Sequence, residues 1–155
     1  MVCSVNIKVK GGAFIIQISS KFTIAIHILT CIDYFYKVGQ KRLITSEFLA
    51  SSIQVNPVII RQIISKLKSA GIIDISRGRG GMKVAKDLNE ITLYDIYKAV
   101  ECVKGSLFHF HENPNPKCYV GKNIHKALDG SLADIQNAFE EKLKSITIKN
   151  IAEKI

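Results

Sequence analysis

The segment from Leu43 to Lys83 constrains the fold of this 155-residue chain more than any other stretch. Thr45 or Ser46 can begin a short helix, because a side-chain oxygen there accepts a hydrogen bond from an unpaired amide of the first turn. Asn56-Pro57 marks a second start, since asparagine caps a helix and proline at its first position loses an amide that would have no partner. We therefore predict two short helices joined by a tight turn.

The second of these helices has two unlike faces. Its apolar residues recur at the three- and four-residue spacing of one helical face: Ile60, Ile63, Ile64 and Leu67. The opposite face carries residue types that read DNA, because arginine binds guanine edges, glutamine binds adenine and valine packs on the thymine methyl group. We predict that bases are contacted by Val58, Arg61 and Gln62, and phosphates by Ser46, Lys66 and Lys83.

A glycine-rich basic turn follows this helix. Gly71 can end the helix in the left-handed conformation, and short apolar strands are expected on either side of Arg77-Gly78-Arg79-Gly80-Gly81. Such a wing would let Arg77 and Arg79 enter a narrow minor groove. A nucleotide-phosphate loop is disfavoured, because the next element is a strand and not a helix. The segment thus predicts a winged helix-turn-helix, mainly α with a small β-hairpin wing, that binds duplex DNA.

Charge is distributed unevenly along the chain. Residues 1–86 hold 13 Lys and Arg against 3 Asp and Glu, or +10, while residues 87–155 hold 9 against 10, or −1. Lysine and arginine supply most non-specific affinity for nucleic acid by neutralising phosphates. A basic half joined to a neutral half therefore fits a DNA-binding module with an assembly element, although a solvated basic surface is the alternative.

Several other classes are disfavoured. No apolar run approaches the roughly 18 to 20 residues that cross a bilayer, so we expect no membrane association and a cytoplasmic protein. The four cysteines, at 3, 31, 102 and 118, are spaced too unevenly for a disulfide framework or a paired zinc site. No recognisable catalytic constellation is present, so an enzyme is not expected.

Outside the segment from Leu43 to Lys83, the sequence predicts an N-terminal extension and further helices. Residues 1–17 show a hairpin pattern but equally fit an appended, non-native extension, because a natural helix start lies at Ser19 or Ser20. A core helix should run from there to about Tyr36. Thr92 and Asp95 fit a capping-box start for a further short helix.

A long helix is expected from about Tyr119 to Leu143. Apolar residues recur along it at three and four, and so long a stripe needs a partner. A second copy of the chain would pair helix with helix, whereas the alternative is packing on the chain's own domain. A last short helix is expected within residues 147–155.

At two stretches the sequence resembles the Rrf2 family of bacterial transcription regulators, which includes IscR, NsrR and CymR. These stretches are Gly71-Ile72-Ile73-Asp74-Ile75-Ser76-Arg77-Gly78-Arg79-Gly80-Gly81 and Ile91-Thr92-Leu93-Tyr94-Asp95-Ile96-Tyr97-Lys98-Ala99-Val100-Glu101. The resemblance implies a homodimer with paired C-terminal helices, recognition helices in successive major grooves, and a wing arginine, Arg77, in the minor groove. It divides the chain into a DNA-binding domain (18–101), a sensor loop (102–118) and a dimerisation helix with its tail (119–155). Where this chain has Ile59-Ile60-Arg61, many members carry Tyr-Leu-Glu, so its preferred DNA sequence should differ.

The resemblance also raises the question of an iron-sulfur cluster. Members with a cluster use three closely spaced cysteines before the long helix, and here only Cys118 matches, because residues 109–117 contain none. One thiolate cannot hold a cluster, so the chain resembles a cluster-free subgroup and no cofactor is expected. A metal site of His109, His111 and Cys118 is too weak a pattern to predict.

Cys118 is still a candidate redox sensor. It stands beside Lys117 at a helix start, where both the dipole and the ammonium favour thiolate. Cys102 or Cys31 could be its partner, within one chain or across a dimer, although an inert thiol is the alternative.

The sequence as a whole predicts a dimeric repressor that binds a palindromic operator and responds to redox state or a small ligand. Two other functions are compatible with the same residues. One is a winged-helix module that binds protein, and the other is a thiol or metal sensor without specific DNA binding.

Overall fold

The computed structural model describes residues 19–40, 44–76, 81–102 and 105–155. The elements in order are α1 (Lys21–Lys37), α2 (Ser46–Ile53), α3 (Pro57–Ser69), β1 (Ile73–Ile75), β2 (Met82–Val84), α4 (Leu93–Ala99), α5 (Tyr119–Lys144) and α6 (Ile148–Ala152). This mainly helical chain with one antiparallel hairpin confirms the predicted fold class. The hairpin suggested within residues 1–17, and Arg77 and Arg79 of the wing, lie outside the described residues.

The helix starts form where local capping signals were identified. The Thr45 hydroxyl accepts a hydrogen bond from the Phe48 amide at 3.1 Å, and the Asn56 side-chain oxygen accepts one from the Val58 amide at 2.8 Å, with Pro57 as the first residue of α3. These bonds satisfy amides that the first turn of a helix leaves unpaired. The tight turn between α2 and α3 is made by Gln54, in the left-handed conformation at φ 56°, and by the Asn56 cap.

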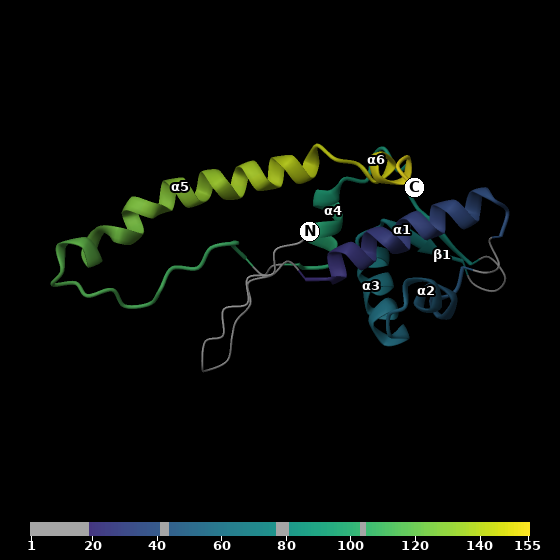
Figure 1. Ribbon diagram of the computed structural model, residues 1–155, viewed down its shortest axis with the longest axis horizontal. Helices are drawn as coiled ribbons and strands as arrows, with labels where there is room; N and C mark the ends of the chain where they lie inside the picture. The colour runs from purple at the N-terminus through teal and green to yellow at the C-terminus, as the bar shows by residue number, and fades with distance from the viewer. Residues whose placement is uncertain (1–18, 41–43, 77–80, 103–104) are drawn as a thin grey trace.

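One hydrophobic core lies beneath the helix-turn-helix, with α1 at its centre (Figure 1). Helix α1 packs against α2, α3, α4, α6 and β2. Its residues Ile28, Leu29 and Ile32 are fully buried. Helix α3 can therefore present only one face to this core, and its other face is left to solvent.

The β-hairpin begins directly after α3. Gly71, at φ +68°, turns the chain there, in the left-handed conformation that glycine adopts at little cost. Ile73 pairs with Val84, and Ile75 pairs with Met82. Ile73 and Met82 are buried, so the hairpin is packed on the core beside α3.

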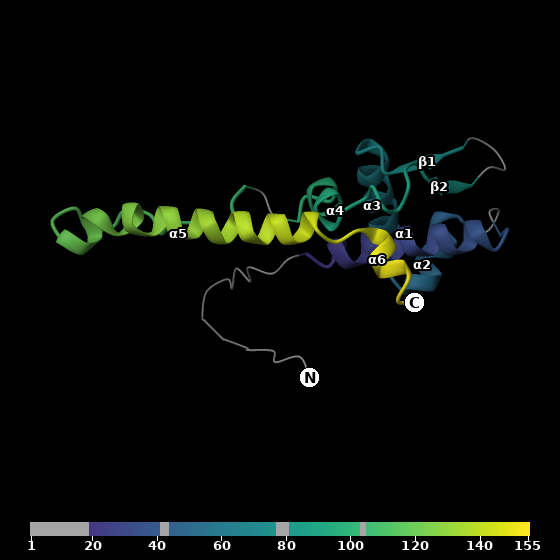
Figure 2. The same ribbon diagram turned by 90° about the horizontal axis from the view of Figure 1, so that it is seen from above.

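Helix α5 extends away from the core (Figures 1 and 2). Its 26 residues give it a length of about 39 Å at 1.5 Å per residue. Leu143 near its C-terminal end is buried, and the ring of Phe139 lies edge-on to Tyr97 at 5.6 Å between centroids. Within the described residues, it is therefore the C-terminal end of α5 that is anchored on the core.

The segment 105–118 runs outward from the core beside α5 and antiparallel to it, as Figure 1 shows. The Leu107 amide donates to the Gln136 side chain at 2.9 Å, and the ring of Phe110 lies 4.7 Å from that of His125. At Gly121 an added Cβ would lie 2.6 Å from the Asn115 carbonyl oxygen. Gly121 is thus the residue that allows this segment to lie directly on the helix.

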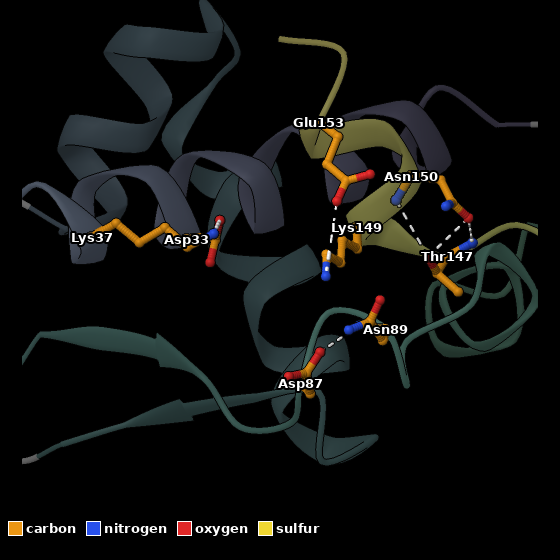
Figure 3. A network of polar contacts seen from close by, with 8 residues as sticks. All are labelled: Asp33, Lys37, Asp87, Asn89, Thr147, Lys149, Asn150 and Glu153. Atoms are coloured by element: carbon orange, nitrogen blue, oxygen red, sulfur yellow. Dashed lines mark hydrogen bonds and ion pairs between the residues drawn. The ribbon is translucent and has the colours of Figure 1, made fainter.

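After α5 the chain returns to the core through α6 (Figure 3). Thr147 and Asn150 form a capping box, and Thr147 bridges to Thr92 at the start of α4. None of the helices in the described part of the chain is long and apolar enough to cross a membrane.

Candidate nucleic-acid interface

The two predicted faces of α3 are both present. Ile60, Ile63 and Leu67 are completely buried, whereas Val58, Arg61 and Gln62 are exposed, Val58 with 54% of its surface. The three residues predicted to contact bases therefore lie together on the outer surface of the N-terminal half of α3. Their contact with bases remains a prediction.

Three lysine and arginine side chains of the predicted interface are paired with carboxylates. Arg61 lies 2.6 Å from an oxygen of Glu47, Lys66 lies 2.6 Å from Glu101, and Lys83 lies 3.5 Å from Asp74. All six side chains are at least one-third exposed to water, and such ion pairs contribute only about 0–1 kcal/mol. These ion pairs therefore add little to the stability of the folded domain.

The sequence did not identify these acidic partners. Glu47 reads as a favourable acid in the first turn of α2, and only the packing of α2 on α3 places it beside Arg61. Ser46, predicted to contact phosphate, donates from its hydroxyl to Glu47 at 3.0 Å. The side chains of Ser46 and Arg61 therefore meet at one carboxylate.

Comparison with known proteins assigns this arrangement to a family. Residues 18–154 match the Rrf2 family, which is described as iron-dependent transcriptional regulators. The chain belongs to the Rrf2 family. It is accordingly a DNA-binding transcriptional regulator, as the resemblance at the wing and α4 implied.

Similar proteins support this assignment. YwnA of Bacillus subtilis, named as an HTH-type transcriptional regulator, is 41% identical over 135 residues, which cover 87% of this chain and 96% of YwnA. A crystal structure described as a DNA-binding protein is 36% identical, with a TM-score of 0.66, and covers 85% of this chain and 98% of its own. CymR, the global cysteine regulator of B. subtilis, has the same fold at 21% identity and a TM-score of 0.66, with 90% and 98% of the two chains covered.

The Rrf2 family is described as iron-dependent, so we asked whether residues of this chain could bind iron. Among the described residues, no group of three His, Cys, Asp or Glu side chains is placed to hold a metal ion. Cys118 is the one cysteine within residues 105–118, and a single thiolate cannot hold an iron-sulfur cluster. These residues do not fit a cluster, and its absence remains a prediction.

The three thiols proposed for redox sensing lie in two different places. Cys118 is exposed at the N-terminal end of α5, far out from the core in Figure 1, whereas Cys31 lies on α1 and Cys102 just after α4. Because α5 is about 39 Å long, the structure does not bring Cys118 together with either of the others in one chain. Burial raises the pKa of Cys31, and it raises the pKa of Cys102 to about 11.

These environments predict an order of alkylation. Among the three cysteines that the structure describes, iodoacetamide at about pH 8 should modify Cys118 first and Cys102 last, because the thiolate is the reactive form and burial leaves Cys102 protonated. Peptide mapping by mass spectrometry during the reaction measures the order. Alkylation of Cys102 should accelerate as the pH rises toward 11. Equal rates for Cys102 and Cys118 at the lower pH would contradict the burial of Cys102.

A cavity of about 760 Å³ lies between α1, residues 83–89 and α6, and Figure 3 draws several of the side chains that line it. Asp33 pairs with Lys37 at 2.7 Å and Lys149 with Glu153 at 3.8 Å, while Lys83, Lys86 and Asp87 also line the cavity. A lining that mixes acids and bases favours no particular class of charged ligand.

Proposed function

We propose that this Rrf2-family regulator is a cytoplasmic repressor that binds a palindromic operator as a homodimer. The observation that carries the proposal is the exposed face of α3, where Val58, Arg61 and Gln62 stand together above a buried apolar face. Arginine, glutamine and valine can read guanine, adenine and thymine respectively. The excess of basic residues in the first 86 positions would supply the phosphate attraction.

The proposed dimer rests on α5. Leu128 and Ile135 have 39% and 52% of their surface exposed, and they lie seven residues apart on one face of a helix that extends away from the core. Large apolar side chains on one helical face are typical of an interface. A second copy of the chain would cover them, and two-fold symmetry would match the two halves of a palindrome.

The proposed contacts follow the predicted roles. Arg61 and its neighbours on α3 would read bases in the major groove, and Arg77 and Arg79 would reach the minor groove. Ser46, Lys66 and Lys83 would hold phosphates. Lys66 and Lys83 each contact a carboxylate in the free protein, so we expect phosphate to replace that carboxylate on binding.

Selection on random DNA duplexes tests the proposal. The reduced protein should enrich an inverted repeat, and binding should weaken steeply with salt, because counterions are released from the phosphates. Arg77→Ala should lower affinity for the selected duplex by roughly tenfold or more.

The matched control is Lys154→Ala, which removes one positive charge near the C-terminus, outside the helix-turn-helix and the wing, and should change affinity little. A selection without any enriched sequence would overturn the proposal and favour a winged-helix module that binds an acidic protein. Equal losses for the two variants would remove Arg77 from the proposed contacts.

We also propose regulation through Cys118 without an iron-sulfur cluster. Its thiol is exposed at the outer end of α5, within the proposed dimer region. Oxidised protein should therefore enrich the operator less strongly than reduced protein, and Cys118→Ser should abolish that difference. An equal response in Cys118→Ser would assign the sensing to another group. Metal and sulfide analysis of anaerobically purified protein tests for a cluster independently.

A further inference from the structure

We propose that Glu47 determines the DNA specificity of this regulator by holding Arg61 for a guanine edge and keeping it away from phosphates. The two residues come from different helices, α2 and α3, and a terminal nitrogen of Arg61 donates to Glu47 Oε1 at 2.6 Å. The inference rests on the proposed sequence-specific function. It adds a residue that does not itself need to touch DNA.

The Glu47 carboxylate is held in place on several sides. Its second oxygen accepts a hydrogen bond from the Ser46 hydroxyl at 3.0 Å, and Glu47 lies in the first turn of α2, where the helix dipole favours negative charge. The hydrogen bond from Arg61 lowers the pKa of Glu47, and its own backbone and Ser46 lower it further. At neutral pH Glu47 is therefore an ionised and oriented acceptor.

An oriented carboxylate restricts what the arginine can do. A guanidinium carries five N–H donors in a planar fork, so one nitrogen bound to Glu47 leaves donors free on the rest of the group. Arginine reads guanine through two such donors, to O6 and N7. Because Arg61 lies on the exposed face of α3 beside Val58, the pair presents a guanidinium that its hydrogen bond to Glu47 already orients in the free protein.

The same carboxylate opposes phosphate binding at this point. Its negative charge repels the DNA backbone, so the Glu47–Arg61 pair contributes little to non-specific affinity. Lys83 is paired less closely, at 3.5 Å from Asp74. A lysine ammonium is also a point charge without a fixed fork, so an acid beside it cannot orient base recognition in the same way.

Two substitutions at Glu47 separate the effects of charge and geometry. Glu47→Gln and Glu47→Ala should both strengthen binding to an unrelated duplex, with a salt dependence corresponding to about one more neutralised phosphate. Glu47→Ala should also lose roughly tenfold in preference for the guanine that Arg61 reads. Glu47→Gln keeps an acceptor oxygen and should lose less.

Fluorescence anisotropy with labelled duplexes measures both quantities. The guanine is identified by replacing each guanine of the selected operator with 7-deazaguanine, which lacks the N7 acceptor. One position should weaken binding of the wild-type protein but not that of Arg61→Ala. At that position the 7-deazaguanine penalty should shrink in Glu47→Ala, and in an Arg61→Ala background Glu47→Ala should have no further effect on it.

Asp74→Asn is the matched control, because it also removes one exposed carboxylate from an ion pair of the DNA-binding domain. It should raise non-specific affinity without changing the preference for any base. A wild-type protein that selects no sequence would refute the proposed function itself. A wild-type protein with a clear operator, and Glu47 variants that keep the full guanine preference, would overturn this inference alone.

Discussion

Replacing Ile135 with aspartate should convert the proposed dimer into a monomer and lower operator affinity by about 100-fold or more, because two half-sites would no longer be bound together. Ile135 has 52% of its surface exposed on the free part of α5, and Leu128 lies two turns away on the same face. In a dimer these residues would be buried, and an aspartate there would be an unpaired charge in an apolar contact. Sedimentation equilibrium measures the mass, and anisotropy measures the affinity.

Asn137→Asp provides the control for this substitution. Asn137 is exposed on the same helix but lies about 200° around it from Ile135, at 3.6 residues per turn. It introduces the same charge away from the apolar face, so it should remain dimeric and bind the operator normally. A dimeric Ile135→Asp variant would show that α5 pairs through another surface or not at all.

The helix boundaries could be predicted because they depend on neighbouring residues. Thr45, Asn56 and Thr92 each accept a hydrogen bond from an amide two or three residues ahead, and such signals are complete within one turn of sequence. The apolar spacing of α3 is equally local and correctly separated its buried face from its exposed face. The sequence could not place Glu47 beside Arg61, because that contact joins residues 14 positions apart through the packing of two helices.

For α5, too, the sequence could not predict which residues pack against which partner. Its apolar spacing indicated the need for a partner but could not distinguish packing on its own domain from packing on a second chain. In the structure Phe139 and Leu143 pack against the core, whereas Leu128 and Ile135 are left exposed. Gly121 was not singled out, because its close approach to residue 115 depends on the path of the segment 105–118.

Shortening a side chain to alanine should affect stability on the buried face of α3 and DNA affinity on its exposed face. Leu67→Ala should lower the free energy of unfolding by about 2–5 kcal/mol, because Leu67 is completely buried and its loss leaves a cavity. Val58→Ala should change that free energy by less than about 0.5 kcal/mol, since Val58 is 54% exposed. It should instead weaken binding at one thymine of the operator, where its methyl groups would pack.

Urea unfolding followed by circular dichroism measures the first quantity, and anisotropy with operator variants measures the second. DNA binding by both variants is measured without urea, at a temperature at which Leu67→Ala is still folded. The affinity of Leu67→Ala then reports on the binding surface alone. Leu67→Ala should then bind the operator almost normally, because its side chain supports α3 from beneath and does not face DNA. If Leu67→Ala, though folded, instead lost base preference while Val58→Ala kept it, the assignment of the two faces of α3 would be wrong.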